Sequence, residues 1–209
     1  MRTLYVVVLG WLWQGWAQPM LFDVLAVNRK VQQYKRHIDR CVEDAEAGWS
    51  ALTMDILAMD GLTSAMTRHF YNCLLSMKIK PQLASSTLTN VRYLEVGTWK
   101  GSSLVSARFG NSHVHGTAID NWSEYGGPRD YFWGNVERFL GDDVEGGAKV
   151  VFHDANAFME GLLGNAVYDI YMYDGGHEYE AHRKAITRFE PYLADSDVSI
   201  VVIDDWNFA

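Results

Sequence analysis

The stretch Arg92-Tyr93-Leu94-Glu95-Val96-Gly97-Thr98-Trp99-Lys100-Gly101-Ser102-Ser103 decides the fold of this 209-residue chain. Tyr93, Leu94 and Val96, with Val91 just before the stretch, are the β-branched, aromatic and aliphatic side chains that predict a buried strand. Gly97 and Gly101 predict a tight turn in which the backbone approaches a ligand without a Cβ in the way. Ser102 or Ser103 can cap a following helix, whose free N–H groups would then point into the turn. A strand carboxylate, two glycines and a helix N-terminus together indicate a small-molecule binding site.

The composition predicts one globular core with an acidic charge balance. The chain is 48% hydrophobic and 21% charged, which is ordinary for a folded domain of this length. Its 18 Lys and Arg residues against 26 Asp and Glu residues give a net charge of -8. A general nucleic-acid surface needs clustered Lys and Arg to contact phosphates, so we expect no nucleic-acid partner.

The two cysteines, Cys41 and Cys73, are far apart in the sequence and form no CxxC motif. Both fall on apolar faces of predicted helices. We therefore expect them to be small buried hydrophobic side chains rather than a disulfide or a metal site. They do not fix the cellular compartment.

Residues 1–17 form an apolar N-terminal segment that allows two interpretations. Arg2 precedes an apolar run from Leu4 to Trp13, and Gly15-Trp16-Ala17 has the small residues of a signal-peptide cleavage site. Because the run is too short to span a bilayer comfortably, a signal peptide or an interfacial anchor is one interpretation. The other is a segment that packs on the domain or on a partner chain. The cytoplasm is the favoured compartment, and a secretory or membrane-anchored location follows only from the first interpretation.

Residues 18–88 are predicted to form a helical region. Apolar residues recur at spacings of three and four from Asp23 to about Ala47, which predicts an amphipathic helix. A second helix is expected from about Leu62 to Lys78, and Pro81 prevents it from continuing.

Residues 89–209 alternate between predicted strands and helices. The strands are expected at residues 91–96, 113–119, 149–152, 169–173 and 198–203. The helices between them are expected at residues 102–109, 128–140, 158–163 and 180–193. This alternation predicts an α/β fold with a doubly wound parallel sheet, in which ligands bind outside the carboxyl ends of the strands.

An acidic residue lies at or beside the carboxyl end of every predicted strand. These acids are Glu95, Asp120, Asp154, Asp174 and the pair Asp204-Asp205. One such acid is weak evidence because Asp is common in turns, but acids at the same place on every strand indicate a binding site. Asp120 is well placed to accept hydrogen bonds from a ribose diol. The turn Gly97-x-x-x-Gly101 lacks the middle glycine of the dinucleotide pattern GxGxxG.

Three blocks in order resemble the class I S-adenosylmethionine-dependent methyltransferases. Leu94–Ser103 resembles their first motif, Tyr173–Glu180 resembles the segment DGDHSYE of the macrocin and cephalosporin-biosynthesis branch, and Val202–Trp206 resembles its late acidic strand end. The similarity spans about Val91 to Asn207. It implies a Rossmann-like sheet with strand order 3-2-1-4-5, from which the two final strands of the family are missing.

The resemblance also implies which residues bind S-adenosylmethionine. The residues of the turn would shape the pocket for its methionine part, and Asp120, followed by Asn121, would hold the ribose hydroxyls. Asp154, with Ala155, would lie beside the adenine amino group. The turn residues in question are Glu95, Gly97, Thr98, Gly101, Ser102 and Ser103.

The resemblance further implies a magnesium site and a general base. In metal-dependent members, acids after the fourth and fifth strands bind Mg²⁺, and the matching positions are Asp174, Asp204 and Asp205. Three oxygen ligands plus waters suit an octahedral Mg²⁺. His177 follows the first of these acids and is the general-base candidate. Asp174 is thus expected to contact the cofactor and to contribute to catalysis.

The expected function is methyl transfer to a hydroxyl of a small molecule, assisted by a divalent metal. An NAD(P)-type Rossmann oxidoreductase is the alternative, disfavoured by the absent middle glycine and the lack of a clear Tyr-Lys hydride relay. A third class is a degenerate, non-catalytic nucleoside-binding module. Without the two final strands of the family, the strand at residues 198–203 would be an exposed sheet edge. We therefore expect a fragment or an unusually truncated family member, or an edge that a second copy of the chain, another partner or the N-terminal helices cover.

Overall fold

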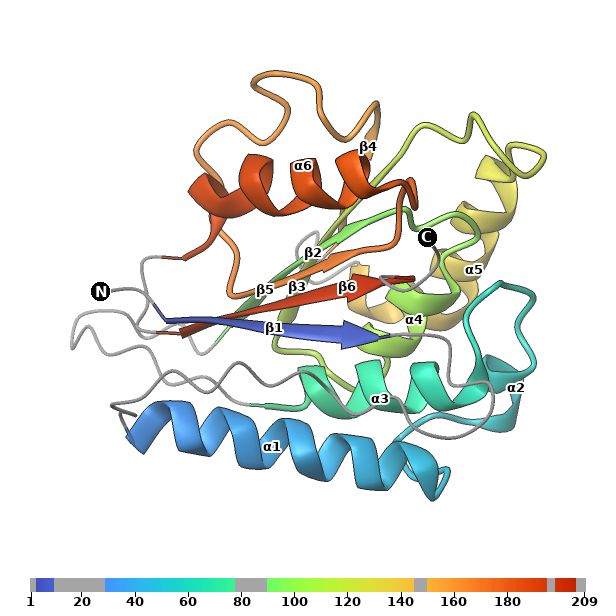
Figure 1. Cartoon of the computed structure of the whole chain (residues 1–209). Coiled ribbons are helices and arrows are strands. Elements are labelled where there is room, and N and C mark those ends of the chain that lie inside the picture. Colours follow the sequence, from blue (N-terminus) through green and yellow to red (C-terminus); the bar gives the residue numbers. More distant parts are fainter. Residues whose placement is uncertain (1–2, 10–28, 78–89, 145–149, 195–197, 206–209) are drawn as a thin grey trace.

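The computed structural model describes residues 3–9, 29–77, 90–144, 150–194 and 198–205. A parallel sheet of six strands lies at its centre in the order β1-β6-β5-β2-β3-β4 (Figure 1). The strands are β1 (Thr3–Leu9), β2 (Val91–Val96), β3 (Val114–Asp120), β4 (Val150–Asp154), β5 (Ile170–Tyr173) and β6 (Val198–Asp204). The five predicted strands thus have the expected order 3-2-1-4-5, and the Rossmann-like fold is confirmed.

The helices cover both faces of this sheet. They are α1 (Arg29–Glu46), α2 (Met54–Leu57), α3 (Ala65–Leu75), α4 (Ser102–Arg108), α5 (Arg129–Val144), α6 (Tyr179–Phe189) and the 3-10 helix η1 (Glu190–Tyr192). In Figure 1, α6 lies on one face, α3 and α4 lie on the other, and α1 packs outside α3. No helix among the described residues is long and apolar enough to cross a membrane.

Two local predictions are corrected. The helix expected at residues 158–163 is a series of turns. Gly161 and Gly164 adopt φ angles of 71° and 54°, a left-handed conformation that a regular α-helix does not accept. The short helix α2 carried no clear periodic pattern and was not predicted.

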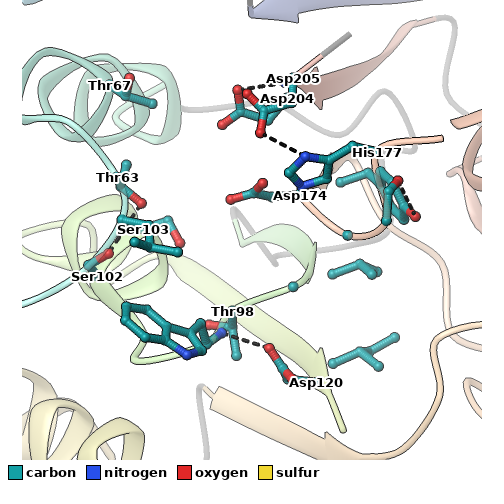
Figure 2. A pocket seen from close by; sticks show the side chains of 18 of the residues that line it. Thr63, Thr67, Thr98, Ser102, Ser103, Asp120, Asp174, His177, Asp204 and Asp205 are labelled. Atoms are coloured by element: carbon teal, nitrogen blue, oxygen red, sulfur yellow. Dashed lines mark hydrogen bonds and ion pairs between the residues drawn. The ribbon is translucent and has the colours of Figure 1, made fainter. Parts of the chain in front are cut away.

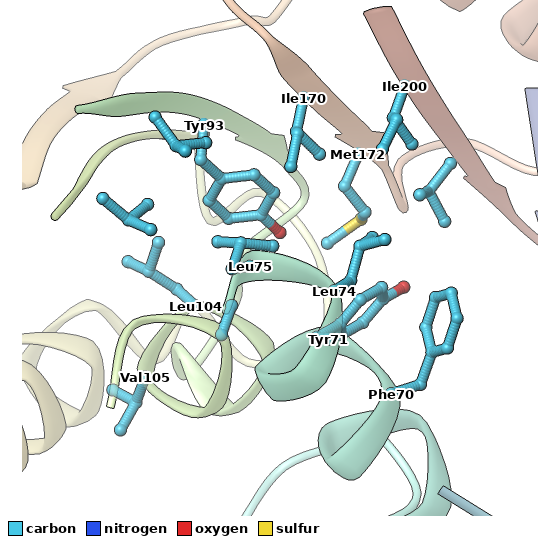
Figure 3. Close-up of a cluster of buried hydrophobic side chains, with 14 of the residues drawn as sticks. Phe70, Tyr71, Leu74, Leu75, Tyr93, Leu104, Val105, Ile170, Met172 and Ile200 are labelled. Carbon is cyan, nitrogen blue, oxygen red and sulfur yellow. The ribbon is translucent and has the colours of Figure 1, made fainter. Parts of the chain in front are cut away.

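The alternating side chains of β2 explain why the sheet has two cores. Val91 and Tyr93 contribute to the cluster beneath α3 and α4, whereas Leu94 and Val96 contribute to the cluster beneath α6. Figure 3 shows the first cluster, which contains Tyr93 of β2 together with side chains of α3, α4, β5 and β6. Burial on both faces is what parallel strands require, because helices cover both of their surfaces.

β1 covers the sheet edge that the sequence left open. Its residues pair in parallel with β6, from Thr3 beside Val198 to Leu9 beside Asp204. The edge expected at residues 198–203 is therefore covered within the chain, by a strand that the sequence analysis did not predict. Val6, Val7 and Val8 are β-branched residues, which suit a strand as well as they suit an apolar leader segment. The rest of the predicted segment 1–17 lies outside the described residues, and association with a second copy stays a prediction.

The cysteines form a disulfide, which corrects the prediction of two separate buried thiols. Cys41 on α1 and Cys73 on α3 are joined, with their Cα atoms 5.4 Å apart. The apolar side chains of the first predicted helix are buried as expected from Val31 onward, but only the packing of α1 against α3 shows that the two sulfur atoms meet. The bond fixes α1 onto α3.

Loss of this disulfide is expected to lower the free energy of unfolding by about 3 kcal/mol, because it closes a long loop in the unfolded chain. The cysteines are separated by 32 positions. Urea unfolding of the wild type with and without a thiol reductant measures the effect. The double variant Cys41→Ser/Cys73→Ser should unfold like the reduced wild type and should not respond to reductant. Equal midpoints for the oxidised and reduced wild type would contradict the prediction.

Candidate active site

A cavity of about 880 Å³ opens at the carboxyl ends of the strands. Its walls come from the ends of β2, β3, β5 and β6, the loops after β3 and β4, the end of α1 and the first half of α3 with the segment before it. Pockets for small molecules commonly have volumes of about 300–1,000 Å³, so this cavity is large enough for a nucleoside cofactor together with a second small molecule.

Gly97 is required by the protein's own packing. Its φ is 86°, and a Cβ on it would lie 1.8 Å from the carbonyl oxygen of Asp174. The expected reason, room for a ligand, is therefore secondary, because the end of β5 already fills the space. Gly101 has a φ of 79°, and a Cβ there would lie 3.0 Å from the Phe132 ring. Gly101 is also the N-cap of α4, so the prediction that Ser102 or Ser103 caps this helix is wrong.

Glu95 lies beneath the cavity and does not form part of its lining. The side chain is fully buried and accepts hydrogen bonds from the hydroxyls of Tyr93 and Ser103, each at 2.7 Å. Burial raises the pKa of Glu95 despite these hydrogen bonds. Ser103 thereby ties the first turn of α4 to β2, and Ser102 donates to the Thr63 hydroxyl at 3.2 Å. Both serines line the cavity.

Asp120 lines the cavity and connects two loops of its wall. One carboxylate oxygen accepts the backbone N–H of Trp99, and the other accepts that of Trp122, both at 2.7 Å. Trp99 and Trp122 have φ angles of 44° and 47°, which non-glycine residues rarely adopt. Each carboxylate oxygen has a further lone pair for a ligand hydroxyl.

The other predicted cofactor residues are placed differently. Thr98, Asn121 and Ala155 line the cavity. Asp154 does not: its exposed carboxylate contacts the guanidinium of Arg129 at 3.3 Å. The neighbouring Asn156 lies in the lining instead.

Asp174, His177 and Asp205 converge on one point of the cavity wall. One ligand atom from each lies within 4.8 Å of the others, and His177 Nδ1 is 3.3 Å from Asp205 Oδ2 (Figure 2). Asp204 also lines the cavity, but one of its oxygens accepts the backbone N–H of Asp205 at 2.9 Å. The loop after β5 therefore brings His177 into the place where three aspartates were expected. The donor set of carboxylates and one imidazole fits a divalent cation.

The sequence did not reveal the cavity wall formed by α1 and α3. Its residues are Val42, Ala45, Glu46, Leu62, Thr63, Ser64, Met66, Thr67 and Phe70. An apolar helical stripe has the same spacing whether it faces a core or a cavity, so periodicity carries no signal for this wall.

A family model described as "Methyltransferase domain" matches residues 94–206, which is more than half of the chain. The chain belongs to this methyltransferase family. The enzyme is a class I, S-adenosylmethionine-dependent methyltransferase, as its sheet order and family model agree. No curated protein sequence is significantly similar to it.

Solved methyltransferase structures are similar to this chain at low sequence identity. Precorrin-6Y C5,15-methyltransferase from Geobacter metallireducens is 17% identical with a TM-score of 0.49, over 73% of this chain and 71% of that one. The SAH-bound methyltransferase PaMTH1 from Podospora anserina is 13% identical with a TM-score of 0.48, over 87% and 73%. A putative caffeoyl-CoA O-methyltransferase from Staphylococcus aureus is 18% identical with a TM-score of 0.45, over 79% and 67%.

The cavity of the methyltransferase fits its sulfonium cofactor. The part near β2 and β3 presents the Asp120 carboxylate, the aromatic rings of Trp99 and Tyr125, and the backbone of the Gly97 turn. A carboxylate can accept ribose hydroxyls, and aromatic faces attract a cationic sulfonium. These residues would therefore hold the cofactor along the ends of β2 and β3.

The acids of the methyltransferase site oppose one another's ionisation. Burial and the charges of Asp204 and Asp205 raise the pKa of Asp174 well above its ordinary value. Burial, helped by the Asp205 charge, raises the pKa of Asp204 to about 6. Positive charge brought into the cavity would relieve this repulsion.

The stability of the ligand-free methyltransferase is expected to fall as pH rises through about 6. The pKa of Asp204 is about 6 in the folded chain against 3.8 ordinarily, so its stabilising protonated form is fully present below about pH 4 and is lost towards pH 7. In thermal melts with EDTA, the stability of Asp204→Asn relative to the wild type should increase from pH 4 to pH 7. At neutral pH the variant should be more stable by roughly 1–3 kcal/mol. Glu137→Gln, which removes an exposed carboxylate, is the control. Parallel pH profiles for wild type and Asp204→Asn would refute the prediction.

Proposed function

We propose that this methyltransferase transfers the methyl group of S-adenosylmethionine to a hydroxyl oxygen of a small molecule, with a divalent cation such as Mg²⁺ in the site. The observation that carries the proposal is the convergence of Asp174, His177 and Asp205 beside the Gly97 turn. In the reaction the oxygen–carbon bond forms, the sulfur–carbon bond breaks, and the hydroxyl proton goes to a base on the enzyme.

Asp120 and the Gly97 turn are proposed to position the cofactor. Asp120 would accept the ribose hydroxyls with the lone pairs that the N–H groups of Trp99 and Trp122 leave available. Ala155 and Asn156 would contact the adenine, a role in which Asn156 replaces the expected Asp154. Orientation of this kind supplies a large part of a methyl-transfer rate, because the methyl carbon must lie in line with the attacking oxygen.

His177 is proposed to take the hydroxyl proton. Its Nδ1 faces Asp205 Oδ2 at 3.3 Å, a contact that orients the imidazole. Asp174 and Asp205 are proposed to hold the cation through their oxygens, the donors that Mg²⁺ prefers, and Asp204 would contribute the oxygen that does not accept the Asp205 N–H. A bound divalent cation would lower the pKa of the acceptor hydroxyl.

Calorimetric titration tests the cofactor first. S-adenosylhomocysteine should bind the wild type, and NAD⁺ should not, since the turn lacks the middle glycine of the dinucleotide pattern. Binding of NAD⁺ alone would favour the oxidoreductase, and binding of neither would favour a non-catalytic module. Formation of S-adenosylhomocysteine with a panel of hydroxylated acceptors then tests transfer, and full activity in excess EDTA would exclude the metal.

The variant His177→Gln shows whether His177 acts as the general base or as a ligand of the cation. If His177 is the base, Mn²⁺ affinity measured by electron paramagnetic resonance should stay near the wild-type value while the rate falls by about 100-fold or more. Asp174→Asn is the matched control and should weaken Mn²⁺ binding. A loss of Mn²⁺ affinity in His177→Gln would instead assign the imidazole to the cation, as its contacts also allow.

A further inference from the structure

The cavity wall formed by α1 and α3 has an apolar surface. Val42 and Ala45 contribute from α1, and Met66 and Phe70 contribute from α3. This wall comes from other segments of the chain than the loops after β3 and β4, where the nucleoside is expected. Apolar walls bind the hydrocarbon part of a ligand, while a few polar groups fix its orientation.

Glu46 is the charged residue of this wall. It is the last residue of α1, it is exposed, and it lines the cavity. Glu43 and Asp44 precede it in the same turn, and no basic residue lies there. The carboxyl end of a helix has a partial negative charge that disfavours acids. Asp44 forms an ion pair with the Arg40 guanidinium at 3.2 Å, whereas Glu46 forms no ion pair within the described part of the chain.

An acid at an unfavourable helix end, facing a cavity, suggests a functional role, because such local conflicts concentrate at functional sites. The remaining charges of the lining strengthen the effect. Five further carboxylates line the same cavity, from Asp120, Glu124, Asp174, Asp204 and Asp205. A cavity with this charge concentrates cations and repels anions. The sulfonium cofactor and one divalent cation would lie at the strand ends, which leaves Glu46 to attract a further cation.

We propose that the acceptor of this methyltransferase is a hydroxylated amine whose ammonium group binds Glu46 and the carboxyl end of α1. The apolar body of the amine packs against Val42, Met66 and Phe70, and its hydroxyl faces His177. This inference rests on the proposed function and adds to it the chemical class of the acceptor.

Three phenols that differ only in one end group test the proposal. They are tyramine with an ammonium group, para-ethylphenol with no charge, and para-hydroxyphenylpropionate with a carboxylate. Calorimetric titration into the wild type, saturated with S-adenosylhomocysteine and Mg²⁺, should rank tyramine as the tightest and the carboxylate as the weakest ligand. The preceding titration with S-adenosylhomocysteine keeps the two proposals separate, because its failure rejects the proposed function and its success leaves the acceptor class to be judged.

Glu46→Gln should weaken the binding of tyramine about five-fold, which is the effect of losing one part-exposed ion pair. It should leave para-ethylphenol and S-adenosylhomocysteine unchanged. Glu43→Gln is the matched control, because it removes the same charge from the same helical turn at a residue outside the cavity lining.

Three outcomes would overturn the inference. Tyramine could fail to bind or bind no better than para-ethylphenol, which would reject an amine acceptor. Equal effects of Glu46→Gln and Glu43→Gln on tyramine would assign the preference to the overall charge. Weaker binding of S-adenosylhomocysteine to Glu46→Gln would show that the Glu46 carboxylate contacts the amino group of the cofactor rather than the acceptor.

Discussion

Gly97→Ala is expected to lower the free energy of unfolding by about 3–4 kcal/mol. The backbone at Gly97 has a φ of 86°, and an added Cβ would lie 1.8 Å from the Asp174 carbonyl oxygen. A left-handed conformation costs an alanine about 1–2 kcal/mol, and forcing a methyl group into packed space costs about 1–3 kcal/mol more. The neighbour is backbone, so no side chain can rotate away.

The backbone cannot move aside because three strands are joined at this point. The Gly97 N–H donates to the Ile119 carbonyl at 2.9 Å, and the Asp174 N–H donates to the Val96 carbonyl at 2.9 Å. Moving the turn would therefore disturb β2, β3 and β5 together. We expect Gly97→Ala also to weaken S-adenosylhomocysteine binding, because Asp174 and the turn form one wall of the cavity.

Gly134→Ala is the matched control for chemical denaturation. Gly134 lies on the exposed side of α5, and a Cβ there has no atom within 4 Å. Alanine is the better helix former, so this variant should be more stable than the wild type by about 0.5–1 kcal/mol. A Gly97→Ala variant as stable as the wild type would show that the turn does not pack as described.

Asp120→Asn is expected to weaken the binding of S-adenosylhomocysteine about ten- to a hundred-fold. A hydrogen bond to a charged acceptor contributes about 1.5–3 kcal/mol, and the amide replaces one acceptor oxygen with a donor. That donor would also face a backbone N–H of Trp99 or Trp122, each now 2.7 Å from the carboxylate. The two loops should therefore lose part of their connection as well.

Asp154→Asn is the control for Asp120→Asn. It shows whether the weaker binding comes from a lost contact of Asp120 with the ribose or from the loss of any one negative charge. Asp154 is the equivalent acid of the neighbouring strand, but it contacts Arg129 outside the cavity lining. Titration of S-adenosylhomocysteine should give this variant an affinity within about two-fold of the wild type, as for other exposed ion pairs. Thermal melts of both variants check that each is folded. Equal losses in Asp120→Asn and Asp154→Asn would remove Asp120 from its proposed role.

Much of the site could be predicted because the information is local. Asp120 and Asp174 each follow a strand that its own residues identify, and parallel strands bring such ends to one edge. His177 was predicted from the segment Tyr173–Glu180, but its contact with Asp205 depends on the conformation of the loop after β5. Asp154 failed to reach the cavity because the sequence does not show which way a side chain turns at the end of an edge strand.

The sequence by itself determined the strands β2 to β6, their order along the chain and the acids at their ends, because the pattern of apolar and turn residues acts over a few neighbouring positions. Only the tertiary structure decided the pairing of β1 with β6, the bond between Cys41 and Cys73, and the wall that α1 and α3 add to the cavity. Each of these depends on segments far apart in the chain meeting in space. Gly97 combines both levels: its turn was evident from the sequence, but the Asp174 carbonyl that requires a glycine there lies on another strand.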